Sequence, residues 1–214
     1  MSTSAYFIGI TGSVLLFFSC QQKEIAKDIT RTITTSQSDA CDNPDAAIAC
    51  CFANMPSQMT AVMNIPNTDH RAEKLIISGT IYKKDGKTPF SDVILYAYHT
   101  DTKGEYSKKG NEKGVQKWHG SHHGWCKTDK NGSYRINTIR PASYPGNTTA
   151  AHIHAAVKLP NNPNPFYITD FMFQDDPLLP KNEQNPFSYQ GGSGIVAVKK
   201  VNRVWVGKRD LVLN

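Results

Sequence analysis

The sequence predicts an all-β protein whose fold class is an antiparallel β-sandwich, and three observations support this prediction. From Leu75 onward, short runs of β-branched and aromatic residues alternate with turn residues. The chain has 15 glycines and 12 prolines, which suits many short turns. No stretch has the length and the period of an amphipathic helix. This pattern is typical of a prealbumin-like or immunoglobulin-like sandwich of about eight strands.

Each expected strand is a run of this kind, and turns such as KKDGKTP and DKNG separate the runs. In chain order, the expected strands are 75–82, 93–99, 124–128, 133–139, 152–159, 167–173, 194–200 and 204–213. Tyr134 lies in an alternating run and is expected in the core. At 214 residues the chain has room for one such domain, which we place at 72–214.

The N-terminus has the pattern of an export signal. Residues 6–18 are apolar, but this stretch is shorter than the roughly 20 residues that cross a bilayer. It ends at Ser19-Cys20, so residues 1–19 are expected to be a lipoprotein signal and Cys20 the lipidated residue; an ordinary signal peptide is the alternative. We therefore expect an exported protein, lipid-anchored in the cell envelope at the outer membrane or periplasm, with 20–71 as a tether and cysteine-containing extension.

Four cysteines follow Cys20, and an exported chain can oxidise them. A disulfide from Cys41 to either Cys50 or Cys51 is expected, because this segment lacks the partners that a zinc site needs. The formal net charge is +6, and the lysines do not form a recognisable nucleic-acid motif, so no nucleic-acid partner is expected. Five lysines fall in one expected loop, where they either draw an anionic small molecule or form solvated surface: Lys103, Lys108, Lys109, Lys113 and Lys117.

His152 and His154 are the first candidates for chemistry. Alternate side chains of a strand share a face, so both imidazoles point the same way and can clamp a metal ion. Ala151, Ala155 and Ala156 are small and leave room beside them. The other interpretation is an incidental pair on a strand.

The motifs around this pair resemble those of the intradiol ring-cleavage dioxygenases, the catechol and protocatechuate dioxygenase family. The similar segments are SGTIYKKDGKTPFSDVILYAYHTDTKGEY, then TDKNGSYRINTIRPASYPG with HIH, then YITDFMFQDDP. The resemblance implies a ferric ion, Fe(3+), held by two tyrosines and two histidines, with a catechol-like aromatic and O2 as substrates. Carried over, it assigns Tyr144 as the catalytic metal ligand that substrate displaces, and His152 and His154 as metal ligands.

The sequence departs from the family pattern at two places. Between Ser107 and Lys127 no tyrosine stands where the second tyrosine ligand is expected, and 145–151 lacks the usual arginine. The loop instead contains KWHGSHHGW, from which His119 is our expected fourth metal ligand; Trp118 and Trp125 could wall an aromatic pocket. Tyr106 of the G-x-Y motif is a further candidate, which we interpret as structural.

Two classes of function are compatible with these features. One is an intradiol-type dioxygenase with a changed metal site, possible as a homo-oligomer. The other is a non-catalytic binding module of the cell envelope, because GTIYKKDGKTPFSDVILYAY also suits a transthyretin-like or carboxypeptidase-regulatory-like β-sandwich. Tyr144, His152 and His154 together favour the enzyme, since a plain sandwich has no reason to combine them.

Overall fold

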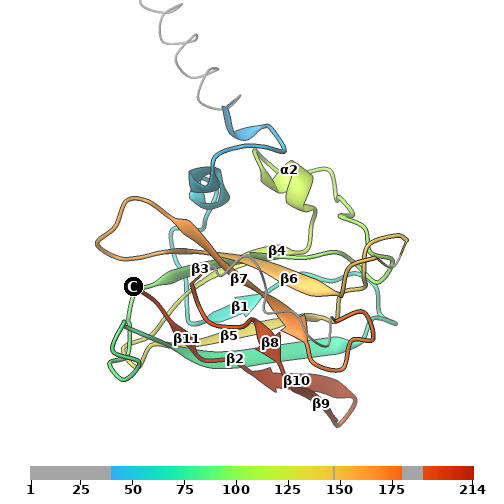
Figure 1. The fold of residues 1–214 in the computed structure, drawn as a ribbon. Coiled ribbons are helices and arrows are strands. Elements are labelled where there is room, and N and C mark those ends of the chain that lie inside the picture. The colour runs from blue at the N-terminus through green and yellow to red at the C-terminus, as the bar shows by residue number, and fades with distance from the viewer. Residues whose placement is uncertain (1–39, 147, 180–189) are drawn as a thin grey trace, which may run out of the picture. The chain divides into compact units, whose positions relative to one another are not determined.

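The computed structural model describes residues 40–146, 148–179 and 190–214, which form two packed β-sheets with little helix (Figure 1). The expected signal segment, the lipidation residue Cys20 and most of the tether lie outside these residues. Within them, no helix is long and apolar enough to span a membrane. The elements are η1 (Ile48–Phe52), β1 (Val62–Asn64), β2 (Lys74–Tyr82), β3 (Ile94–Tyr98), α2 (Gln116–His119), β4 (His123–Lys127), β5 (Ser133–Ile139), β6 (His152–Lys158), β7 (Phe166–Phe173), β8 (Ile195–Val196), β9 (Val198–Val201), β10 (Val204–Lys208) and β11 (Leu211–Val212).

Both sheets are mixed, which corrects the expectation of a purely antiparallel sandwich. The first sheet has the order β1-β5-β2-β10-β9, with β11 also paired to β2. Its β1–β5, β2–β10 and β2–β11 pairs are parallel. The second sheet has the order β4-β3-β6-β7-β8, and its β7–β8 pair is parallel. Alternation of apolar residues predicts which face of a strand is buried, but not the direction of its neighbour.

The described residues contain eleven strands rather than about eight. Strand β1 falls in the extension, where no strand was expected, and the two C-terminal runs are each divided. The run 194–200 changes sheets, because β8 pairs with β7 whereas β9 pairs with β10. The run 204–213 is interrupted between β10 and β11, where Arg209 is buried.

The core lies between the two sheets and comes from alternate residues of their strands. In β2 the buried apolar side chains are Leu75, Ile77 and Ile81, and in β6 they include Ile153 and Ala155. Tyr134 belongs to this core, as expected, and is 2% exposed. Because strand side chains alternate, an inward Ile153 places His152 and His154 on the opposite face of the second sheet.

This outer face of the second sheet is partly covered by the extension and by α2 (Figure 1). A disulfide joins Cys41 to Cys50, one of the two expected pairings. The Cys51 carbonyl accepts a 2.8 Å hydrogen bond from Nε1 of Trp125, and Phe52 packs on Tyr96. The extension therefore forms a second, smaller apolar cluster with the sheet.

Candidate metal centre

Four side chains bring their donor atoms together on the outer face of the second sheet. His152 and His154 come from β6, Tyr144 from the loop before β6, and Tyr106 from the loop between β3 and α2. The Tyr144 oxygen lies 3.2 Å from Nε2 of His152 and 3.1 Å from Nε2 of His154. The Tyr106 oxygen lies 2.7 Å from the Tyr144 oxygen and 3.1 Å from Nε2 of His154. The two Nε2 atoms are 3.1 Å apart.

Asp101 organises the loop that carries Tyr106. Its Oδ1 accepts hydrogen bonds from the backbone N–H groups of Lys103 and Glu105 at 2.7 and 3.1 Å. Its backbone carbonyl accepts the Ala142 N–H at 3.0 Å, which ties this loop to the loop that carries Tyr144. Local side-chain to backbone bonds of this kind stabilise tight turns without a regular ladder.

Gly104 allows the two tyrosine loops to touch. It has a φ of +80°, a conformation that side chains with Cβ rarely adopt. A Cβ at this position would lie 1.9 Å from the Ser143 carbonyl oxygen and 3.2 Å from Cα of Tyr144. The glycine of the G-x-Y motif therefore lets the backbone before Tyr106 lie directly against the backbone of Tyr144.

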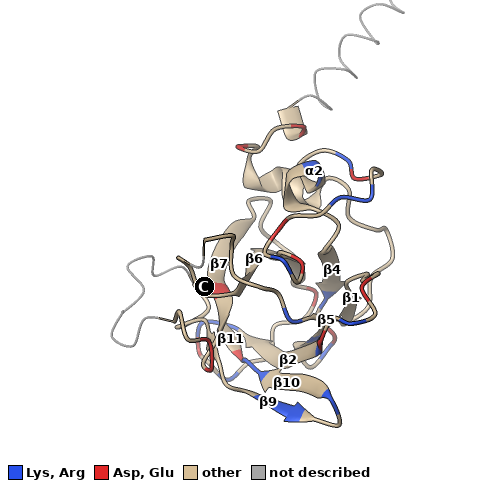
Figure 2. Cartoon of the chain, turned by 90° about the vertical axis from the view of Figure 1, so that its right-hand side faces the viewer, with Lys and Arg blue, Asp and Glu red and all other residues tan. Residues whose placement is uncertain are grey.

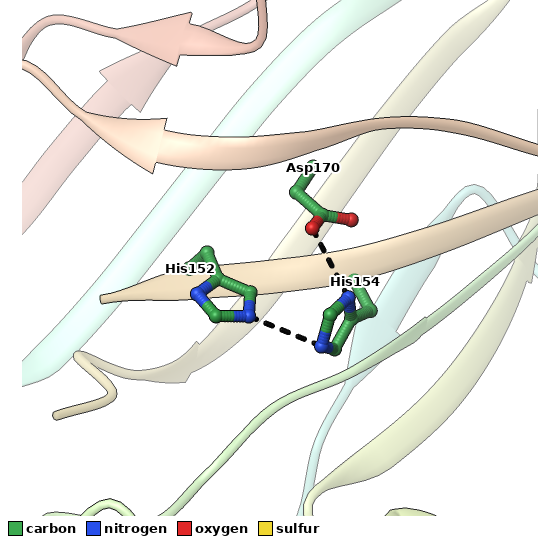
Figure 3. Close-up of side chains that lie close together, drawn as sticks. All are labelled: His152, His154 and Asp170. Carbon is green, nitrogen blue, oxygen red and sulfur yellow. Dashed lines mark hydrogen bonds and ion pairs between the residues drawn. The ribbon is translucent and has the colours of Figure 1, made fainter. Parts of the chain in front are cut away.

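Each histidine is oriented through its other ring nitrogen. Nδ1 of His152 lies 2.7 Å from the Ala150 carbonyl oxygen, and Nδ1 of His154 lies 3.1 Å from Oδ2 of Asp170 (Figure 3). A carbonyl or carboxylate oxygen accepts a hydrogen bond from Nδ1–H, so the proton stays on Nδ1 and each Nε2 keeps its lone pair for the cluster. His152, His154 and Asp170 also form a group whose ligand atoms lie within 4.8 Å of one another. Because Asp170 bonds Nδ1 of His154, its position suits orientation of that ring.

Burial shifts the proton equilibria of the cluster toward neutral side chains. It raises the pKa of Tyr106, and the hydrogen bond with Tyr144 raises it further. Burial also raises the pKa of Tyr144. The pKa of His152 is lowered, first by burial and then by the neighbouring His154. The phenols therefore keep their protons at neutral pH in the absence of a cation, whereas His152 is ready to act as a neutral ligand.

The donor set fits a metal ion. Metal–ligand bonds of about 2 Å hold neighbouring donors roughly 3 Å apart, and the four donors have closest separations of 2.7–3.2 Å. Two imidazoles suit many first-row metals, while ionised phenol oxygens are hard anionic ligands that favour a small, highly charged ion. A bound cation would oppose the effect of burial and lower the phenol pKa values, because its charge stabilises phenolate.

Comparisons with known proteins identify the family of the chain. A protein-family model described as "Dioxygenase" matches residues 50–198. A catechol 1,2-dioxygenase of Acinetobacter baylyi (strain ATCC 33305 / BD413 / ADP1) is 38% identical over 77 residues, which make up 36% of this chain and 24% of that enzyme. The chain belongs to the intradiol dioxygenase family.

Solved structures of the intradiol dioxygenase family share the fold. The dioxygenase domain of a dioxygenase and carbohydrate-binding protein fusion from Streptomyces sp. SirexAA-E matches with a TM-score of 0.56 and 20% identity, over 76% of this chain and 90% of that one. Catechol 1,2-dioxygenase from Pseudomonas arvilla C-1 matches with a TM-score of 0.58 and 15% identity, over 90% of this chain and 69% of that one. At these identities the similarity concerns the fold alone.

His119, our expected fourth ligand, does not lie in the cluster of donor atoms. Nδ1 of His119 lies 2.8 Å from the Tyr96 oxygen. Its ring stacks on Tyr98 at 3.6 Å between centroids, and the other side of Tyr98 stacks on His154 at 4.7 Å. Burial lowers the pKa of His119 to about 3, so its ring is neutral. His119 therefore lies behind Tyr98, as packing beneath the site.

The sequence suggests Tyr106 only as a further candidate with a structural interpretation, whereas its oxygen lies in the cluster. The loop after Ser107, where the second tyrosine ligand was expected, contains no tyrosine up to Lys127. The usable signal was Gly104 two residues earlier, because a glycine in a tight loop often marks a close approach of two backbone segments. The other loop histidines lie elsewhere: His122 is buried beside His99, and His123 on β4 bonds the Gly120 carbonyl.

The structure also shows the positions of Trp118 and Trp125, which were expected to line an aromatic pocket, and of the loop lysines. Trp125 packs against Tyr96, beneath the extension. Trp118 is 43% exposed, with the Lys108 ammonium over its ring. Acidic residues are interspersed among the loop lysines (Figure 2), and Lys117 forms an ion pair with Asp42. Partial neutralisation of this kind makes solvated surface the simpler interpretation of the lysines.

Proposed function

We propose that this chain is an Fe(III)-dependent intradiol ring-cleavage dioxygenase that acts on catechol-like aromatics with O2. Its metal ligands in this proposal are Tyr106, Tyr144, His152 and His154. The observation that carries the proposal is the convergence of two phenol oxygens and two imidazole nitrogens, each within 3.2 Å of another. Membership of the family and the printed names of the relatives support the reaction class.

A bound ferric ion would supply Lewis-acid activation of a chelated catechol for its reaction with O2. The histidines hold their Nε2 lone pairs toward the centre because Ala150 and Asp170 hold the Nδ1 protons. The short contact between the two phenol oxygens fixes Tyr106 and Tyr144 relative to each other. These side chains thus preorganise the centre before substrate binds.

Tyr144 is suited to accept a proton from the substrate. Burial raises the pKa of its phenol, so a Tyr144 phenolate that is displaced by a catechol oxygen is a good base. The proton would be taken up at Oη of Tyr144, which lies 2.7 Å from the Tyr106 oxygen. Tyr144 is therefore both a ligand and a proton acceptor in the proposed reaction.

Oxygen uptake by the iron-loaded protein tests the proposal. With a panel of catechols, we expect uptake of about one O2 per catechol and a muconate-type diacid as product, because both oxygen atoms enter the cleaved ring. Tyr144→Phe should abolish turnover. Iron binding without uptake on any catechol would contradict the catalytic proposal and leave a binding module of the cell envelope.

We also propose that the mature chain is lipid-anchored through Cys20 in the cell envelope. The short apolar stretch at 6–18 and the following Ser19-Cys20 support this proposal. The Cys41–Cys50 disulfide is compatible with an oxidising compartment. Incorporation of labelled palmitate in the native host should be lost in Cys20→Ser; equal labelling of both would contradict the anchor.

A further inference from the structure

Strand β7 contains one extra residue where it runs beside β6. The ladder pairs Ile153 with Phe171 and then Ala155 with Ile168. Between these pairs β6 advances by two residues and β7 by three, so the register shifts. An insertion of this kind is a β-bulge, which changes the face to which the following side chains point.

The bulge lies opposite His154 and is made by Thr169 and Asp170. Ile168 and Phe171 are both fully in the core, although residues three apart in a regular strand face opposite sides. Without the bulge, Asp170 would share the core face with Ile168. With it, Asp170 points to the outer face, where its carboxylate meets Nδ1 of His154 (Figure 3).

A bulge disrupts the regular ladder locally, and Arg209 bonds two backbone carbonyls of this bulge. Its Nη1 donates to the carbonyl oxygens of Thr169 and Asp170 at 2.9 and 3.2 Å. Its Nη2 donates to the Gly191 carbonyl at 3.0 Å, and the guanidinium lies 4.3 Å from the centre of the Phe171 ring. Arg209 is only 6% exposed, so it is a buried cation that spans from the β10–β11 junction to the bulge.

Burying a guanidinium is unfavourable unless its donors form hydrogen bonds. An apolar residue would fill the space without that cost, but it could not satisfy the carbonyls of the bulge. A lysine in the same place offers a compact ammonium rather than a planar fork, so it cannot reach all of the carbonyls in the same geometry. An arginine at position 209 is therefore explained by its hydrogen bonds to the bulge carbonyls and not by core packing.

We propose that Arg209 is a positioning residue: it fixes the Thr169–Asp170 bulge and thereby holds Asp170 on Nδ1 of the candidate ligand His154. The chain of contacts is Arg209 to the bulge carbonyls, Asp170 to Nδ1, and Nε2 of His154 to the metal centre. This inference rests on the proposed metal site. It assigns Arg209 an effect on metal affinity although the residue touches neither metal nor substrate.

A double-mutant cycle on iron affinity tests the inference. Because partners of ligating histidines contribute about 10–100-fold to metal affinity, Arg209→Lys and Asp170→Ala should each weaken iron binding by roughly tenfold or more. The double variant should bind iron as weakly as Asp170→Ala alone, since Arg209 acts through that carboxylate. The visible absorption of the iron-loaded protein should shift in the same two variants.

Tyr134→Phe is the matched control. The Tyr134 hydroxyl donates to the Arg209 backbone carbonyl at 2.7 Å, so its loss disturbs the same buried region and leaves the guanidinium in place. We expect this variant to lose stability but to keep iron affinity. If Arg209→Lys fails to fold, Arg209→Gln, which is neutral and makes fewer of the three bonds, takes its place in the cycle.

The outcomes separate this inference from the function on which it rests. If the wild-type protein binds no iron, both the proposed metal site and the positioning role of Arg209 are contradicted. Wild-type binding together with unchanged affinity in the Arg209 variant, or with losses that add in the double variant, overturns the positioning role alone. A loss in Tyr134→Phe equal to that in Arg209→Lys would likewise reduce Arg209 to a structural residue.

Discussion

The phenol oxygens of Tyr106 and Tyr144 lie 2.7 Å apart, although 38 positions separate the two residues in the sequence. Neither residue belongs to a strand, so sheet pairing does not bring them together. Their loops are joined by the Asp101 carbonyl, which bonds the Ala142 N–H, and by the close approach of Gly104 to Ser143. The proposed centre therefore depends on loop contacts as much as on β6.

Gly104→Ala should separate the two tyrosines. The new Cβ would lie 1.9 Å from the Ser143 carbonyl oxygen, which is backbone and cannot rotate away. The tyrosine loops must then move apart, and we expect iron affinity to fall by roughly tenfold or more, as for other losses of ligand positioning. Competition with a chelator of known affinity measures this loss.

Gly110→Ala is the control for Gly104→Ala. Gly110 has a similar φ of +89°, but nothing lies within 4 Å of a Cβ built on it. Both substitutions therefore carry the backbone cost of a positive φ, about 1 kcal/mol, and only Gly104→Ala adds the clash. Equal effects of the two variants on iron affinity would show that the close approach of the loops does not matter.

Iron binding should release protons. The pKa values of Tyr106 and Tyr144 are raised by burial, so both phenols are protonated in the iron-free protein at neutral pH. Ligation requires phenolate, and affinity should therefore rise with pH, with about two protons displaced per ion. The pKa of His152 is lowered, so this imidazole adds no proton to the count at pH 7.

The slope of log affinity against pH measures this proton release. Tyr106→Phe should reduce the slope by about one proton per ion, because one phenol no longer ionises. A slope near zero for the wild-type protein would mean that neither phenol binds iron, which would limit the site to its histidines.

The iron-free fold should lose stability in mild acid, partly through His99. Nδ1 of His99 lies 2.7 Å from the Thr100 carbonyl, which only accepts, so Nε2 accepts from the Thr138 hydroxyl at 2.6 Å. Burial lowers the pKa of His99 to about 3. The unfolded residue titrates near 6.5 and binds the extra proton first. Stability from this residue is complete above that value and falls as pH drops, by about 2 kcal/mol at pH 5.

Denaturant unfolding at pH 7 and pH 5 checks this assignment. His99→Gln should lose about 2 kcal/mol less than the wild-type protein between the two pH values. His70→Gln replaces an exposed histidine by the same residue and is the control variant. An unchanged loss in His99→Gln would mean that other buried histidines carry the acid sensitivity.

Much of the fold follows from local sequence, and the remainder depends on contacts between distant segments. Alternating runs such as that of β2 predict which residues enter the core, and His152 and His154 follow from the same alternation in β6. The short β1 and the divided C-terminal strands were not predicted, because parallel pairing and a change of sheet leave no local signal.

In the candidate site, too, some residues could be predicted from the sequence and others could not. The resemblance to the family led to Tyr144, His152 and His154, which the structure brings together. His119 was expected because it follows a bulky aromatic residue that could anchor the loop, but Tyr98 lies between its ring and His154. Asp170 was not predicted, because an unbroken alternation through YITDFMF puts it on the same face as the core residue Ile168, and only the bulge separates the two.

Visible absorption after aerobic iron loading tests the central claim most directly, because iron(III) bound to phenolate is coloured. We predict a visible band with one iron per chain in the wild-type protein, a shifted and weaker band in Tyr106→Phe, and an unchanged band in His119→Phe, which keeps an aromatic ring on Tyr98. A colourless wild-type protein would contradict the metal centre. An unchanged band in Tyr106→Phe, with loss of colour in His119→Phe, would contradict the ligand set proposed here.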